Sequence, residues 1–149
     1  MIVLTGTCNC GAVHFEITEP LQAAAYCHCT RCQRRTGTGA ACNARVDAAA
    51  LRVVRGEDRI RSWKPADGAE KCFCGDCGSG LFARTPDGLS VGVRLGVLDG
   101  DVRITPSLHQ FTAYAAPWES IPDDGLPRYP ERAPQKALET VAGLSGGLS

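Results

Sequence analysis

The sequence lacks the features that mark membrane proteins and nucleic-acid-binding proteins. No stretch of its 149 residues approaches the ~18 consecutive apolar residues of a membrane span. Neither sign of charge is in excess, because 16 Lys and Arg face 16 Asp and Glu and the formal net charge is zero. A neutral chain has no general attraction for nucleic acid or for an anionic membrane surface. We therefore expect neither of these as a partner.

The sequence also gives no reason to expect a secretory leader or a disulfide framework. The first residues, Met1-Ile2-Val3-Leu4, carry neither the basic start nor the long apolar segment of a signal peptide. We therefore expect a cytoplasmic protein, and disulfides are rare in that reducing compartment. The nine cysteines are also an odd number, which cannot all pair within one chain. Metal binding or catalysis is the favoured use of these cysteines.

Aromatic residues and helical periodicity are scarce, which favours a mostly β fold. The chain has two Trp, three Tyr and four Phe, and its length suits one ordinary domain. Apolar residues alternate with polar ones in short runs bounded by Gly, Pro or Asp, the pattern of half-buried strands. We predict strands at 13–17, 51–54, 60–63, 80–84 and 90–95, and short helical turns at 30–35 and 47–50. The domain is expected to span 1–130.

The C-terminal segment 131–149 differs from the rest in composition. Pro, Ala, Gly and Ser dominate it, and it has no cysteine or aromatic residue. At most one short helix, over 134–142, is expected there. Without a bulky residue to anchor it, this tail is predicted to be loosely docked or disordered.

Seven cysteines fall into three tight groups, a spacing typical of zinc sites. They are Cys8 and Cys10; Cys27, Cys29 and Cys32; and Cys74 and Cys77. A structural zinc site takes four protein ligands, whereas a catalytic site takes three and keeps one position open. The outer pairs can form the closed site and the middle triplet the open one. Spacing alone leaves alternatives, because Cys42, Cys72 or His28 can complete the second site, and a Cys-x-x-Cys pair can be a redox motif.

The residues around these cysteines resemble the glutathione-dependent formaldehyde-activating (GFA) family, which includes the centromere protein V type. The matching segments are Thr7-Cys8-Asn9-Cys10-Gly11, Cys27-His28-Cys29-Thr30-Arg31-Cys32 and Phe73-Cys74-Gly75-Asp76-Cys77-Gly78, followed by Leu98-Asp99, His109, Ala116-Pro117-Trp118 and Leu126-Pro127-Arg128-Tyr129. The resemblance implies a β-tent zinc fold of small antiparallel sheets tied by a structural zinc, similar to methionine-R-sulfoxide reductases. It also implies two zinc ions, a structural one on Cys8, Cys10, Cys74 and Cys77 and a catalytic one on Cys27, Cys29 and Cys32.

The resemblance implies a carbon–sulfur lyase type of reaction, in which glutathione adds to formaldehyde to give S-hydroxymethylglutathione. Arg31, Arg34 and Arg35 sit beside the middle cysteine group, so we expect them to bind the carboxylates of glutathione. His28, between two expected ligands, and His109 are the candidates for proton transfer. We expect Phe111 and Trp118 to pack in the core or to line the pocket.

Two other functions compete with this one. The first is a zinc-binding module that binds a protein partner and catalyses nothing. The second is a thiol redox enzyme resembling methionine-R-sulfoxide reductase, with Cys42 or Cys72 as the attacking thiol. That enzyme requires an exposed cysteine of low pKa. Without such a role, Cys42 and Cys72 are expected to be small buried apolar residues.

Overall fold

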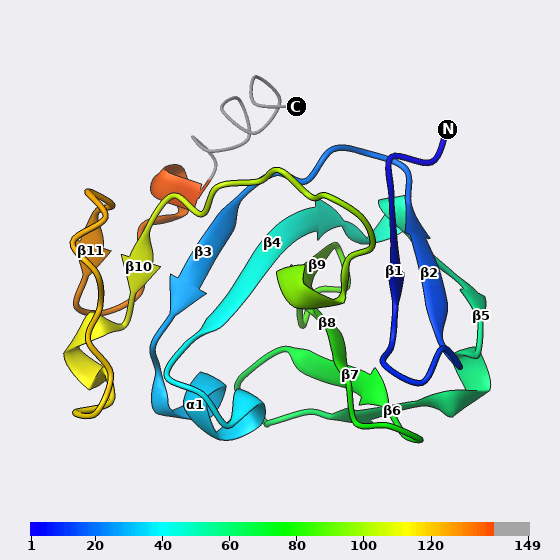
Figure 1. The fold of residues 1–149 in the computed structure, drawn as a ribbon, viewed down its shortest axis with the longest axis horizontal. Helices are drawn as coiled ribbons and strands as arrows, with labels where there is room; N and C mark the ends of the chain where they lie inside the picture. The colour runs from blue at the N-terminus through cyan, green and yellow to red at the C-terminus, as the bar shows by residue number, and fades with distance from the viewer. Residues whose placement is uncertain (139–149) are drawn as a thin grey trace. The chain divides into compact units, whose positions relative to one another are not determined.

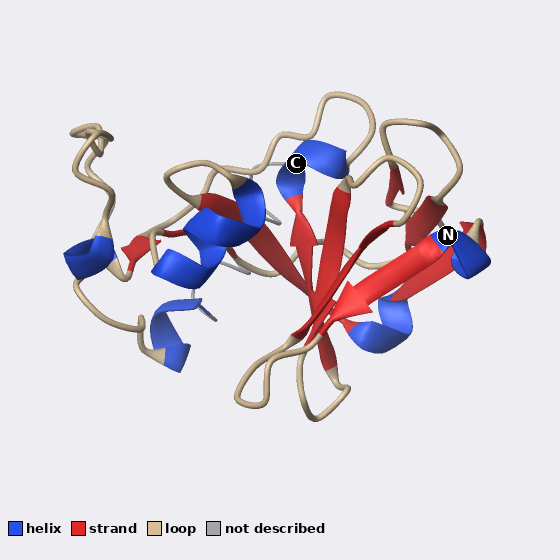
Figure 2. Cartoon of the chain, turned by 90° about the horizontal axis from the view of Figure 1, so that it is seen from below, coloured by secondary structure: helices blue, strands red, loops and turns tan. Residues whose placement is uncertain are grey.

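The computed structural model describes residues 1–138 (Figure 1). Strands predominate and helix occurs in short segments, as the colouring in Figure 2 shows. The prediction of a mostly β fold is therefore confirmed. The strands are β1 (Leu4–Thr7), β2 (His14–Ile17), β3 (Ala24–Cys27), β4 (Ala41–Asp47), β5 (Leu51–Arg55), β6 (Ile60–Trp63), β7 (Glu70–Cys74), β8 (Gly80–Arg84), β9 (Ser90–Arg94), β10 (His109–Gln110) and β11 (Arg128–Tyr129). The helical segments are α1 (Thr30–Thr36), η1 (Ala48–Ala50), η2 (Glu57–Arg59), η3 (Leu95–Val97), η4 (Thr112–Tyr114) and residues 135–138.

The chain divides into two compact units. Unit 1 comprises residues 1–21 and 44–103, and unit 2 comprises residues 22–43 and the chain from 104 onward. Strand β4 begins in unit 2 and ends in unit 1. Each of the two cysteine constellations predicted from the sequence lies within a single unit.

In unit 1, one sheet has the order β1-β2-β5, with antiparallel neighbours (Figure 1). Its register places Gly6 opposite Phe15, and the Phe15 ring occupies the space that a side chain at residue 6 would need. Phe15 is fully buried and meets Phe82 edge to face at 5.6 Å. Alternation along β2 therefore directs Phe15 and Ile17 into the core, as the sequence pattern predicts.

The other strands of unit 1 include two consecutive antiparallel pairings, β7 with β8 and β8 with β9, and β6 pairs with the outer side of β7. Cys72 and Cys74 lie two residues apart on β7, and both are buried. The register shifts between Cys72 and Phe73, so Phe73 pairs with Gly80. The turn from β7 to β8 thus starts at Cys74, which is where the third cysteine group lies.

In unit 2, β10 runs parallel to both β3 and β11. The register aligns His109 with Tyr26 on one side and with Arg128 on the other. A small core of Ala25, Leu108 and Ala133 is covered by Tyr129, Ala137 and Leu138. The predicted tail, as far as residue 138, therefore packs on this small core, whereas residues 139–149 of that prediction lie outside the described residues.

The predicted elements correspond closely to the observed ones. Strands predicted at 60–63 and 80–84 coincide with β6 and β8, and the predicted helical turn at 30–35 is α1 with one further residue. The alternation pattern does not predict six of the observed strands, which are β1, β3, β4, β7, β10 and β11. Three of these, β3, β4 and β7, contain cysteines or small alanines in place of the branched residues that mark a strand.

Candidate functional site

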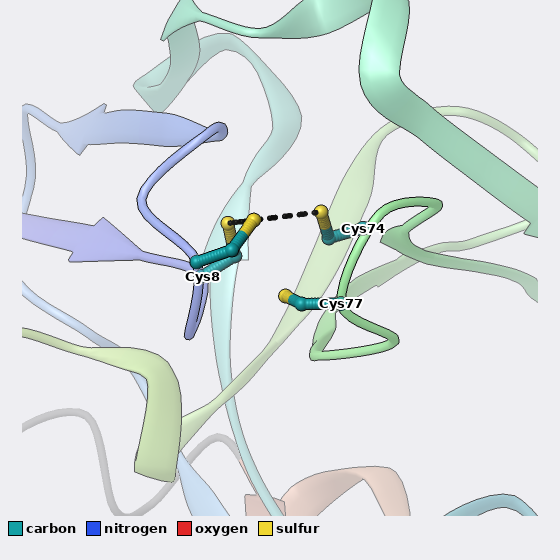
Figure 3. Close-up of side chains that lie close together, drawn as sticks. Cys8, Cys74 and Cys77 are labelled. Carbon is teal, nitrogen blue, oxygen red and sulfur yellow. Dashed lines mark hydrogen bonds between the residues drawn. The ribbon is translucent and has the colours of Figure 1, made fainter.

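Four cysteines of unit 1 converge from two segments far apart in the sequence (Figure 3). Cys8 and Cys10 follow β1, Cys74 ends β7, and Cys77 lies in the turn after it. Their sulfurs all lie within 4.8 Å of one another, with 3.6 Å between Cys8 and Cys10 and 3.8 Å between Cys10 and Cys74. Sulfurs at about 2.3 Å from one tetrahedral zinc lie about 3.8 Å apart. This four-cysteine cluster therefore fits a closed zinc site.

Tight turns shape both halves of the four-cysteine cluster. The carbonyl of Cys8 accepts the amide of Gly11, and the carbonyl of Cys74 accepts the amide of Gly78. Both glycines have positive φ, 80° and 81°, in the region that favours glycine. Ser79 joins the two halves, because its hydroxyl accepts the amide of Asn9 and lies 3.2 Å from the Cys77 sulfur. The Cys-x-Cys-Gly and Cys-x-x-Cys-Gly motifs thus specify the local backbone.

The thiols of this cluster influence one another's ionisation. Hydrogen bonds from the hydroxyl and the backbone of Ser79 lower the pKa of Cys77 to about 5. At Cys10 the backbone of Ala12 favours the thiolate, but the neighbouring Cys8, Cys77 and Cys74 outweigh it and raise the pKa to about 12. A divalent cation removes this repulsion between adjacent thiolates. The charge pattern of the cluster is therefore suited to a metal.

Three cysteines of unit 2 form the second group, the three-cysteine cluster. Cys27 ends β3, Cys29 precedes α1, and Cys32 lies in its first turn; their sulfurs lie within 4.8 Å of one another. Cys29 caps α1, since its sulfur accepts the amide of Cys32 at 3.3 Å. Hydrogen bonds from Cys27 and Cys32 lower the pKa of Cys29 to about 2, whereas the contacts of Cys27 with Cys29 and Cys32 raise the pKa of Cys27. These soft sulfur donors fit a zinc ion that keeps one position open.

None of the residues that the sequence offered as a fourth ligand lies within the three-cysteine cluster. Among the described residues, neither Cys42, Cys72 nor His28 belongs to the set of ligand atoms around Cys27, Cys29 and Cys32. The structure thus brings together the four cysteines and the three cysteines that the sequence pattern grouped.

Two buried histidines and a carboxylate form a hydrogen-bonded chain in unit 2. His28 Nε2 lies 2.9 Å from His109 Nδ1, and His109 Nε2 lies 2.8 Å from Asp124 Oδ2. The two histidines are 3% and 2% exposed, and Tyr26 stacks on His109 at 4.8 Å. Burial lowers the pKa of His28, and His109 acts in the same direction. The hydrogen bond from His109 lowers the pKa of Asp124.

The sequence pattern indicates both histidines but gives no sign of Asp124. Its position, 15 residues after His109 in a loop between η4 and β11, carries no local signal. Because β10 pairs in parallel with β11, the loop that leads into β11 comes back beside His109 at the start of β10. Arg128 fastens the loop by donating to the carbonyls of Ile121 and Pro122.

A family model described as glutathione-dependent formaldehyde-activating enzyme matches residues 3–114. The chain belongs to this GFA family. The GFA match includes all seven clustered cysteines and both buried histidines. A relative from Halomonas elongata, provisionally named a glutathione-dependent formaldehyde-activating enzyme, is 29% identical over 138 residues, which cover 88% of this chain and 73% of the relative.

A crystal structure of a Rhodobacter sphaeroides protein shares the fold. It is similar to this GFA chain with a TM-score of 0.56 and 32% sequence identity, and the match covers 65% of this chain and 89% of the other. This solved structure supports the fold prediction independently of the family model.

The three arginines expected at the site of this GFA protein lie on α1. Arg31, Arg34 and Arg35 are spaced at i, i+3 and i+4, which places the three arginines on one side of α1. The same helix contains the cluster residue Cys32. Arg34 is exposed and the other two are half-buried. Arg34 and Arg35 also lie in the last turn, where positive charge stabilises the helix dipole.

Cys42 and Cys72 belong to neither of the two GFA cysteine clusters. Cys72 is 1% exposed, which disfavours the predicted alternative of a thiol that attacks substrate, and Cys42 is half-buried. Trp118 is 71% exposed and does not pack in the core, so of the two positions expected for it only the lining of a pocket stays a prediction. Phe111 is half-buried and begins η4 with a positive φ of 58°. Within residues 1–138, no helix is long and apolar enough to cross a membrane.

Proposed function

We propose that this protein is an enzyme that adds the thiol of glutathione to formaldehyde, with the three-cysteine cluster as the catalytic zinc site. The observation that carries this proposal is the convergence of three sulfurs, within the described residues, without a fourth side-chain ligand. Three protein ligands and an open position are the mark of a catalytic zinc. Family membership and the name of the Halomonas relative support glutathione and formaldehyde as the substrates.

In the same proposal the four-cysteine cluster holds a structural zinc. Four sulfurs complete the coordination of zinc and leave no position for substrate. The cluster also ties the segment after β1 to the turn after β7, which are more than 60 residues apart in the chain. A cross-link of this kind stabilises a unit that has only short strands.

The proposed reaction needs no redox partner. The S–H bond of glutathione breaks as its sulfur forms a bond to the carbonyl carbon. The carbon–oxygen π bond becomes a lone pair on oxygen, and this oxygen takes up one proton for the one that the thiol releases. Zinc bound at the three-cysteine cluster supplies a centre that favours the thiolate form of a bound thiol. The protein itself holds the two reactants together, which converts an encounter into an oriented addition.

The arginines of α1 are proposed to bind glutathione. Three thiolates around one Zn²⁺ leave a net negative charge, and the two carboxylates of glutathione add further negative charge. Arg31, Arg34 and Arg35 offset that charge and offer paired N–H donors that match carboxylate geometry. Because glutathione is a cytoplasmic thiol and none of the nine cysteines, all within residues 1–138, forms a disulfide, we also infer a cytoplasmic location.

The test measures adduct formation from glutathione and formaldehyde with wild-type protein and with the triple variant Arg31→Ala, Arg34→Ala, Arg35→Ala. We expect the wild-type protein to accelerate the reaction. The triple variant is expected to raise KM for glutathione at least about tenfold, equivalent to about 1.4 kcal/mol of binding. Its zinc content is expected to stay unchanged.

The matched control is Arg103→Ala, which removes an exposed arginine of unit 1 that pairs with Asp101. It is expected to leave KM unchanged. Wild-type protein that does not accelerate the reaction would exclude the proposed activity. A triple variant with the wild-type KM would exclude the arginine role and leave the activity in place.

A further inference from the structure

The hydrogen-bonded chain of His28, His109 and Asp124 has a fixed direction, which begins at Asp124. One carboxylate oxygen of Asp124 accepts the amide of Leu126 at 3.1 Å, and the other faces His109 Nε2 at 2.8 Å. An ionised carboxylate can only accept hydrogen bonds. His109 Nε2 must therefore carry the hydrogen of this bond.

The donor at His109 Nε2 in turn fixes which atom donates in the hydrogen bond between His109 and His28. A neutral imidazole with hydrogen on Nε2 has a lone pair on Nδ1. His109 Nδ1 thus accepts, and His28 Nε2 donates across the 2.9 Å contact. The same rule leaves His28 Nδ1 without hydrogen, so that this nitrogen is an acceptor.

This last acceptor is buried and unused. His28 is 3% exposed, and its Nδ1 has no hydrogen-bond partner within the described part of the chain. The carboxylate oxygen Oε2 of Glu119, whose charge acts on His28, is a second buried acceptor without a partner there. Buried acceptors without donors are costly and rare in proteins. Two such acceptors favour a ligand that brings hydrogen-bond donors.

We propose that Asp124 is a positioning residue, which acts through His109 to hold His28 in the tautomer whose Nδ1 accepts a hydrogen bond from an N–H group of the thiol compound that binds at the three-cysteine cluster. His28 lies between Cys27 and Cys29 in the chain, which places its backbone at that cluster. The identity of this ligand as glutathione rests on the proposed function. The tautomers of the two histidines do not depend on it.

Nitrogen-15 NMR of histidine-labelled, zinc-loaded protein at about pH 8 tests this directly, because a ring nitrogen with hydrogen and one without have well separated shifts. Hydrogen is expected on Nε2 of both His28 and His109. His14 is an internal reference for the other tautomer, with hydrogen on Nδ1. The Thr7 hydroxyl donates its hydrogen to Asp99, so the Thr7 oxygen must accept a hydrogen bond from His14 Nδ1. Glutathione is expected to shift the His28 Nδ1 signal upfield, as acceptance of a hydrogen bond does.

The variant Asp124→Asn tests the positioning role. Its amide oxygen is expected to keep the Leu126 contact and present the NH₂ group to His109, which moves hydrogen to Nδ1 of both histidines. Asp123→Asn removes the neighbouring exposed charge and is expected to leave the spectrum unchanged.

Three results would overturn the proposal: hydrogen or a metal on His28 Nδ1 in the wild-type protein, no response of that nitrogen to glutathione, or Asp124→Asn with wild-type tautomers. Adduct formation is measured on the same samples. Predicted tautomers together with the glutathione response of His28 Nδ1, but without adduct formation, would count against the proposed function alone. Adduct formation with the opposite tautomers would count against the positioning role alone.

Discussion

Replacement of Cys74 by serine is expected to leave unit 1 without its native fold. Serine is a poor zinc ligand, and Cys74 is fully buried at the point where the four-cysteine cluster joins β7. Structural zinc contributes on the order of 10 kcal/mol of apparent binding free energy in peptide models. A domain of this size is stable by only about 5–15 kcal/mol. We expect insoluble protein, or soluble protein that has lost near-ultraviolet circular dichroism and binds a hydrophobic dye.

Cys72→Ser is the matched control, because it makes the same chemical change at another buried cysteine of β7. Cys72 contacts Arg84, whose Nη1 lies 3.4 Å from its sulfur, and it belongs to neither cluster. This variant is expected to stay folded and to keep its zinc. Folded Cys74→Ser protein with a full complement of zinc would show that Cys74 is not a ligand.

Cys29→Ser is expected to abolish adduct formation while the protein stays folded. Cys29 is a half-buried residue of unit 2, and the four-cysteine cluster of unit 1 is untouched by the change. Loss of residues that merely orient metal ligands costs about 10–100-fold in activity or affinity. Loss of a ligand is therefore expected to cost more than about 100-fold in kcat/KM, together with one zinc ion per chain.

The control for Cys29→Ser is Cys42→Ser, a second half-buried cysteine of unit 2 that lies outside both clusters. It is expected to retain zinc and activity. Should Cys29→Ser keep wild-type kcat/KM, the three-cysteine cluster would not be the catalytic centre.

The cysteine clusters could be predicted because their geometry is local. In Cys8-Asn9-Cys10-Gly11 and in the turn from Cys74 to Gly78, the ligands and the glycine that permits the turn lie within five residues. The strands with clear alternation, such as β2 and β9, could be predicted for the same reason.

The histidine chain could not be predicted as a whole, because it depends on tertiary structure. Asp124 reaches His109 through the parallel pairing of β10 and β11, each a strand of two residues. Strands this short have no periodicity to detect. The packing of Ala133 against Ala25 and Leu108 was missed for a related reason, since small residues in a Pro- and Ala-rich segment give no sign of burial.

The most direct test of the two-centre account is the zinc content of the purified wild-type protein, measured by elemental analysis against protein concentration before and after mild chelation. We predict two zinc ions per chain. The ion at the three-cysteine cluster is expected to leave first, so that one ion remains in a protein that is still folded but has lost its response to glutathione. A single zinc per chain, held tightly and without any effect of glutathione, would contradict the account.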